Sequence, residues 1–126
     1  VVNISTSTAT DYLKTSVIGP GSSMNVGTIT VGLADLNAGF DLALEVVAPT
    51  THKGNAGIID GSFATSTEII SGATPATIVK TIGSHYTGIV ASSGYKVVYT
   101  LSIDDDNYAE LSTTPGTATI TYTLQN

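Results

Sequence analysis

Only one dense cluster of charged side chains stands out in this sequence. Asp104, Asp105 and Asp106 follow one another, and such a run of carboxylates supplies some of the six to eight oxygens that Ca²⁺ prefers. The segment lacks the alternating acidic positions, the Gly at position six and the Glu at position twelve of the helix–loop–helix calcium site. A solvated turn explains the cluster best, and a structural calcium site at these three residues is the weaker alternative.

The two histidines do not indicate a catalytic or metal site. His52 and His85 lie in separate turn-rich stretches, and no Ser stands in a G-x-S-x-G frame. A catalytic His needs an oriented partner and a nucleophile at hydrogen-bond distance. Two His with no Cys and no spaced third ligand also make a poor zinc site. We therefore expect surface histidines, no enzymatic activity and no organic cofactor.

Exposed flat aromatic side chains, which stack on sugar rings, are scarce. The chain has no Trp, and most of its six Tyr fall in runs that resemble strands. Tyr12, Tyr86 and Tyr108 are the candidates for exposure, but aromatic residues in strands more often lie in the core or at a sheet edge. A secreted ligand- or sugar-binding β-sandwich module is thus one alternative function, without a specific motif behind it.

Charge and length narrow the classes of protein further. The 126 residues suit one domain, and the net charge of −6 argues against a nucleic-acid partner, which needs clustered cations. The four Lys are scattered along the chain, so no basic patch for an anionic membrane surface is expected. No stretch approaches the roughly 20 apolar residues of a membrane span, so we expect no membrane insertion.

The surface of this protein must be covered largely by hydroxyl groups. Charged residues make up 11% of the chain, well below the usual quarter, and Thr and Ser are abundant. Such surfaces are typical of exported proteins and of proteins that pack against copies of themselves. The absence of Cys leaves stability to the core alone. An extracellular, cell-surface location is therefore the expectation.

Strict alternation of apolar and polar residues predicts half-buried antiparallel strands. It is clearest in Phe40–Ala48, Tyr95–Ile103 and Ala118–Leu124. These three strands should line the core through Leu42, Leu44, Val97, Tyr99, Ile120 and Tyr122.

Shorter runs between Gly, Pro, Asn and Asp add further strands. We expect strands in Tyr12–Ile18, Met24–Leu36, Ile58–Ile70 (two short ones), Thr77–Ile82 and Tyr86–Ala91, and a loop in Pro49–Gly57. Gly27 and Gly32 suggest a bulge or bend within the second of these runs. The total of about eight or nine strands predicts an all-β, antiparallel immunoglobulin-like or jelly-roll-like sandwich with almost no helix.

The first ten residues stand apart from the strands that follow them. Residues 1–10 have the composition of a strand, yet no hairpin signal joins them to the next segment of the chain. We therefore divide the chain into an N-terminal extension, residues 1–10, and a single sandwich domain, residues 11–126. Such an extension is a candidate for donation to a neighbouring copy, because strand addition satisfies a row of unpaired N–H and C=O groups.

The Thr- and Ser-rich extension, the Cys-free strand pattern and the final strand that contains Tyr122 resemble donor-strand pilin or fimbrial subunits. These are the chaperone–usher pilins and analogous microbial β-sandwich pilins. The resemblance implies a filament of identical subunits, extracellular and active in adhesion or biofilm, in which an N-terminal donor strand fills the groove of the next subunit. Carried over by position, the inward side of the donor strand would be Val2, Ile4, Thr6, Thr8 and Thr10.

A viral or phage surface or decoration protein is the other alternative function. It would share the acidity, the Thr-rich strands and the absence of Cys. In such a protein the first residues would be an arm along a neighbour or the first strand of their own sheet. If residues 1–10 are paired within their own subunit, the donor-strand mechanism in its simple form is wrong.

Overall fold

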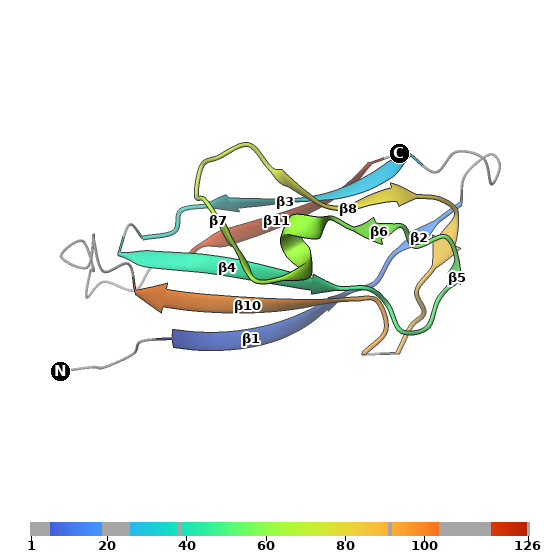
Figure 1. Cartoon of the computed structure of the whole chain (residues 1–126), viewed down its shortest axis with the longest axis horizontal. Helices are drawn as coiled ribbons and strands as arrows, with labels where there is room; N and C mark the ends of the chain where they lie inside the picture. The colour runs from blue at the N-terminus through green and yellow to red at the C-terminus, as the bar shows by residue number, and fades with distance from the viewer. Residues whose placement is uncertain (1–5, 19–25, 38, 91, 104–116, 126) are drawn as a thin grey trace.

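Two antiparallel four-stranded sheets lie face to face in the computed structural model, which describes residues 6–18, 26–37, 39–90, 92–103 and 117–125 (Figure 1). In spatial order, the first sheet contains β1 (Thr6–Leu13), β10 (Tyr95–Ile103), β4 (Phe40–Val47) and β7 (Thr67–Ile69). The second contains β11 (Thr119–Gln125), β3 (Gly27–Ala34), β8 (Ala76–Ile82) and β6 (Ile58–Ile59). A small third sheet at one end contains β2 (Ser16–Val17), β9 (His85–Tyr86) and β5 (Lys53–Gly54).

The core lies between the two larger sheets, and alternation along the strands fills it. In β4 and β10, Leu44 pairs with Tyr99 and Val46 with Val97, so that their side chains point to the same face. Leu42, Leu44 and Val97 are buried, whereas Tyr99, Ile120 and Tyr122 are partly buried and pack against the core. The core expected from the three strongest strands is therefore confirmed.

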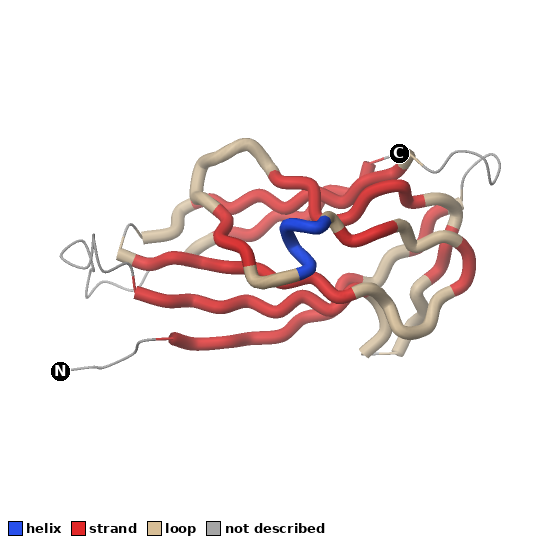
Figure 2. Tube along the Cα trace, viewed as in Figure 1, coloured by secondary structure: helices blue, strands red, loops and turns tan. Residues whose placement is uncertain are grey.

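The expected fold class is confirmed at the level of antiparallel, nearly all-β architecture (Figure 2). The described residues form eleven strands rather than eight or nine, because several strands are only two residues long. The one helix among them is a single 3₁₀ turn, η1 (Gly61–Ala64), whose first turn is capped by the Asp60 carboxylate 3.1 Å from the Ser62 amide. No helix of the described part is long and apolar enough to cross a membrane.

Some strand boundaries differ from expectation where tertiary contacts interrupt a local pattern. The run Tyr12–Ile18 divides into β1 and β2, which belong to different sheets. The expected strand Tyr86–Ala91 is described up to residue 90, and in this part only Tyr86 is in a strand, β9. Within the Ile58–Ile70 run, Phe63 reaches the core from η1.

The bulge expected in the Met24–Leu36 run is present at its beginning. The pairing of β3 with β8 shifts register between Gly27 and Thr30. A Cβ at Gly27 would lie 2.9 Å from the backbone oxygen of Ile82, so glycine allows this close approach. No register shift occurs at Gly32.

The described part of the N-terminal extension pairs with the chain's own sheet. All of β1, from Thr6 to Leu13, pairs antiparallel with β10. The strand crosses the expected boundary between residues 10 and 11 without a break. In the single chain, residues 6–10 are thus the edge of the sandwich and not a separate arm. Val2 and Ile4 lie outside the described residues.

Candidate functional site

The candidate site is the side of the sandwich between β1 and β11. Each is an edge strand, with β10 as the sheet neighbour of β1 and β3 that of β11. Side chains from both sheets meet between these edges, where the hydroxyl groups of Tyr99 and Tyr122 hydrogen-bond to each other. An unpaired strand edge is a template for another strand, so this side is suited to pairing between chains.

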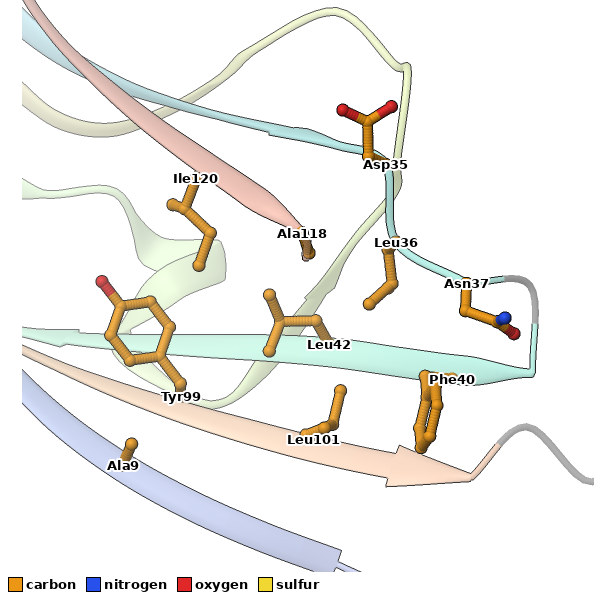
Figure 3. A pocket seen from close by; sticks show the side chains of 10 residues that line it. All are labelled: Ala9, Asp35, Leu36, Asn37, Phe40, Leu42, Tyr99, Leu101, Ala118 and Ile120. Carbon is orange, nitrogen blue, oxygen red and sulfur yellow. The ribbon is translucent and has the colours of Figure 1, made fainter. Parts of the chain in front are cut away.

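A cavity opens on one side of this tyrosine pair (Figure 3). Its volume is about 580 Å³. It is lined by Ala9, Asp35, Leu36, Asn37, Phe40, Leu42, Tyr99, Leu101, Ala118 and Ile120. The small side chains of Ala9 and Ala118, on the two opposing edges, leave this space open. Most of the lining is apolar, so the cavity is a continuation of the core toward the open side.

A second cavity lies farther along the same side. It has a volume of about 410 Å³ and is lined by Tyr12, Leu13, Lys14, Thr15, Ser16, Ile29, Tyr122 and Leu124. These residues again come from the end of β1, from β11 and from the core. Together the two cavities form a row between β1 and β11 with the tyrosine pair between them.

The side chains of β1 face this row in an order opposite to the one expected for a donor strand. Ala9, Asp11 and Leu13 pair with Tyr99, Val97 and Tyr95, which are inward-facing residues of β10. Thr8 and Thr10 pair with Thr100 and Val98 on the opposite face. Residues 8–11 are all exposed, Ala9 and Asp11 included, and Leu13 is the partly buried residue of the core-facing set. In the chain's own sheet, Thr8 and Thr10 therefore lie on the outer face of β1. Their inward position in a strand donated to a neighbour stays a prediction. Thr6 pairs with Ser102.

Burial and charge raise the pKa values of both tyrosines in the pair. Loss of solvent around the ring is the main reason that the pKa of Tyr99 is raised, and the Asp11 carboxylate adds to the effect. Burial likewise raises the pKa of Tyr122, with further contributions from Tyr99 and Asp11. Both hydroxyls therefore keep their protons at neutral pH and hold the two sheets together through a hydrogen bond.

A polar cluster fixes the chain immediately after β1. The Thr15 amide donates to the Thr87 hydroxyl at 2.9 Å, and the Thr87 amide donates to the Thr15 carbonyl at 3.1 Å. His85 contacts the Thr15 hydroxyl through Nε2 and the Gly83 carbonyl through Nδ1, at 3.0 Å for the latter. A carbonyl only accepts, so Nδ1 carries a proton and donates it to Gly83.

This cluster corrects the expectation that His85 is a surface residue. His85 is 5% exposed and Thr87 is 2% exposed. The Tyr95 ring lies edge-on to the imidazole, with ring centroids 6.5 Å apart and an interplanar angle of 78°. Both nitrogens of His85 have partners in the fold, so this residue joins the segment after β1 to the turn at Gly83.

Gly94 supports the same stretch of chain from the other side. Its φ of +101° is unfavourable for residues with a Cβ, and a Cβ there would lie 2.2 Å from the Leu13 carbonyl oxygen. The end of β1 thus rests directly on the backbone of Gly94. The sequence signal for this position was the Ser-Ser-Gly stretch before the strand Tyr95–Ile103, which indicates a turn but not its contact with Leu13.

The other predicted site residues are not brought together. Asp104, Asp105 and Asp106 lie outside the described residues. His52 is exposed in a loop, as expected, and Tyr86 is also exposed, whereas Tyr12 is half-buried. Within the described ranges, no three His, Asp or Glu side chains are placed to hold a metal ion.

Comparisons of this chain with protein-family models, with curated proteins and with solved structures found no match.

Proposed function

We propose that this protein is the repeating structural subunit of an extracellular homopolymer of the pilus or fimbria kind, in which β1 passes from one copy into the sheet of another. The observation that carries this proposal is the placement of β1. It is the edge strand of its sheet, and Lys14 and Thr15 connect it to β2, the strand that follows. Exchange of a terminal element between identical copies reuses the same contacts and is a low-cost route to assembly.

In the single chain, residues 6–10 pair with the chain's own β10, which contradicts an extension that is only donated. The proposal is therefore exchange of a strand that also pairs within its own chain. A chain that pairs its own β1 and an assembly that exchanges β1 contain the same β1–β10 ladder. They differ mainly in the path of Lys14 and Thr15, which connect β1 to the rest of its chain. The proposed donor face is revised to Ala9, Asp11 and Leu13, which pair with the inward-facing residues of β10 in the register of β1.

Release of β1 requires the loss of few apolar contacts. Of its inward residues, Ala9 is small, Asp11 is charged and Leu13 alone is a large apolar side chain packed against the core. The strand is held mainly by main-chain hydrogen bonds, each worth about 0.5–1.5 kcal/mol net. An inward-pointing charge on an edge strand also restrains indiscriminate edge-to-edge pairing, so Asp11 favours exchange into a matching site.

The extracellular location rests on composition. A surface rich in Thr and Ser and a charged fraction of 11% support it. The same features support a structural role over a catalytic one, together with the separation of the candidate catalytic residues in the described fold. The proposed partners are identical subunits.

Engineered disulfides test the exchange. Thr8 and Thr100 are direct cross-strand partners, and Cα atoms of such pairs are about 4.5–5.5 Å apart, within the range for a disulfide. Because the chain has no Cys, the Thr8→Cys/Thr100→Cys variant should give covalent oligomers after assembly and oxidation, resolved on a denaturing gel and reversed by thiol.

The matched control is Ala43→Cys/Thr100→Cys. Ala43 pairs with Thr100 from β4, which stays in the same domain in either state, so this variant should form links only within one chain. A Thr8→Cys/Thr100→Cys protein that gives monomer bands alone, at concentrations where the chain assembles, would refute the proposed function. Failure of the chain to assemble at any concentration would refute it as well.

A further inference from the structure

The two ends of the sandwich differ in shape and in charge. β10 connects them, from Tyr95, which lies against His85 of the small third sheet, to Ile103, which pairs with Phe40 (Figure 1). We call the first the third-sheet end and the second the cavity end. The nine residues of β10 separate the two ends by about 30 Å.

The free cationic side chains lie toward the third-sheet end. The chain has four Lys and no Arg. Lys14 follows β1 directly, Lys53 is in β5 and Lys96 is the second residue of β10, and all three are exposed. The fourth, Lys80, forms an ion pair with Asp60 at 3.5 Å. The third-sheet end therefore presents unpaired positive charge.

The cavity end carries carboxylates and none of the four Lys. Asp35 is exposed and lines the larger cavity, and Asp41 pairs with Ser102 near the end of β10. Asp11 and Glu45 lie within β1 and β4, between the two ends. The ends are thus oppositely charged, and two copies placed end to end in the same direction attract each other there.

The third-sheet end also exposes two aliphatic side chains. Ile89 and Val90, between β9 and β10, are 82% and 67% exposed, and we name them the apolar knob. The Val90 carbonyl accepts from the Ser93 amide at 2.9 Å and from the Ser93 hydroxyl at 2.5 Å. Lys53 lines a depression together with Gly88, the residue before Ile89. The knob is therefore held in place by hydrogen bonds and has a cation beside it.

The cavity end offers an apolar site of suitable size. Leu36, Phe40 and Leu101 surround the cavity of about 580 Å³, and each is only partly buried (Figure 3). This volume is within the roughly 300–1,000 Å³ of pockets that take drug-sized ligands, so branched aliphatic side chains fit. Insertion of such side chains would remove the apolar lining from water, which is favourable.

We propose that the apolar knob of one copy inserts into the cavity of the next, with the cationic end of the first against the anionic end of the second. The two surfaces are unlike and lie at opposite ends, so the contact continues from copy to copy along the long axis. This inference rests on the proposed homopolymer. It does not require exchange of β1, because the knob and most of the cavity belong to other segments.

Ile89→Asp tests the knob in the full chain. Ile89 is exposed, so the variant should keep the unfolding midpoint of the wild type. An unpaired carboxylate is costly to bury in an apolar cavity, so the protein concentration needed for assembly should rise at least about tenfold. Light scattering and electron microscopy measure this concentration.

The matched control is Ile58→Asp. Ile58 is 60% exposed on β6, at the edge of its sheet opposite β11, and its replacement should leave the concentration for assembly unchanged. Equal concentrations for the two variants would overturn the proposed contact.

Two complementary defects test the direction of the contact. Ala118 is exposed and lines the cavity, so Ala118→Phe fills the cavity and keeps the knob, whereas Ile89→Asp keeps the cavity. Both changes are placed in the Thr8→Cys/Thr100→Cys chain, oxidised as dilute monomers so that β1 stays in its own sheet. In sedimentation each protein alone should be monomeric, and their equimolar mixture should form pairs. A mixture that stays monomeric at millimolar concentration, or equal association of either protein alone, would overturn the contact.

The oxidised chains also separate this contact from strand exchange, because β1 cannot leave its sheet in them. A monomeric mixture, together with interchain links when Thr8→Cys/Thr100→Cys is oxidised after assembly, would refute the contact and leave the exchange standing. Pairs in the mixture without such interchain links would support the contact and refute the exchange.

Discussion

At the scale of single residues, Tyr95 shows how the interior uses a polar side chain. Its ring is fully buried, and its hydroxyl donates to the Ala56 carbonyl. Burial raises the pKa of Tyr95 to about 12, and a hydrogen bond with Thr15 partly opposes this rise. The residue thus joins the core to the loop around Ala56 and lies beside the connection after β1.

The raised pKa predicts a loss of stability at high pH. In the unfolded chain Tyr loses its proton near pH 10, whereas in the folded protein it does so near 12. The stabilising contribution is therefore complete below about pH 10 and is lost as the pH rises from 10 to 12. Urea unfolding from pH 8 to 12 should show a steeper decline for the wild type than for Tyr95→Phe.

The same variant provides a check at neutral pH. Tyr95→Phe should lower the free energy of unfolding by about 1–2 kcal/mol, because the buried Ala56 carbonyl loses its partner. Since Tyr99 and Tyr122 titrate in both proteins, their effect cancels in the comparison. If the free energy of unfolding fell equally with pH in the wild type and in Tyr95→Phe, the raised pKa of Tyr95 would be contradicted.

At the scale of elements, β1 depends on a glycine that belongs to another part of the sequence. Gly94 and Gly72 both have positive φ, at +101° and +79°. A Cβ at Gly72 would meet nothing within 4 Å, whereas one at Gly94 would clash with the backbone of Leu13 and Lys14. An alanine at Gly72 would therefore suffer backbone strain alone, whereas an alanine at Gly94 would suffer backbone strain and a clash with the end of β1.

We predict different costs for the two alanine variants. Gly72→Ala should destabilise the fold by roughly 1–2 kcal/mol, from the left-handed backbone alone. Gly94→Ala should cost roughly twice as much or more, because the end of β1 must move away, and hydrogen exchange of the β1 amides should accelerate. Chemical denaturation and hydrogen exchange measure these effects. Equal costs, with β1 amides unchanged, would show that the contact with Leu13 is unimportant.

At the scale of the whole molecule, the sandwich is completed by a strand that contributes few large side chains. Without residues 1–13, the edge of β10 would be unpaired and the row of cavities would lose one wall. The rest of the core, centred on Leu44, Ile78 and Val97, would be unchanged. The truncated domain should therefore fold but be less stable and open to strand addition.

A peptide should replace the missing strand. A peptide of residues 6–13 should bind the chain lacking residues 1–13 and raise its unfolding midpoint, because it restores the β1–β10 ladder. A peptide with Leu13→Asp should bind more weakly, since Leu13 packs against the core. Calorimetry and thermal unfolding measure both effects. No binding of the native peptide at millimolar concentration would contradict this account of β1.

The sequence alone determined the antiparallel β class and the central core. Strands such as Phe40–Val47 and Tyr95–Ile103 have a period of two that is written in neighbouring residues, so each strand specifies its own buried face. The expected core residues on these strands, Leu42, Leu44 and Val97, are buried. For these strands the local pattern is sufficient to predict the buried residues, because only one pairing register buries all the apolar side chains of the alternating face.

Only the tertiary structure decided the candidate site. The pairing of β1 with β10 joins residues about 90 positions apart, and its register, which places Ala9 and not Thr8 or Thr10 toward the core, is set by the partner strand. The burial of His85 depends on Thr15, 70 residues away, and the need for glycine at position 94 depends on Leu13. Contacts between segments so distant in sequence leave no periodic signal in either one, so the connection after β1 emerged only from the assembled fold.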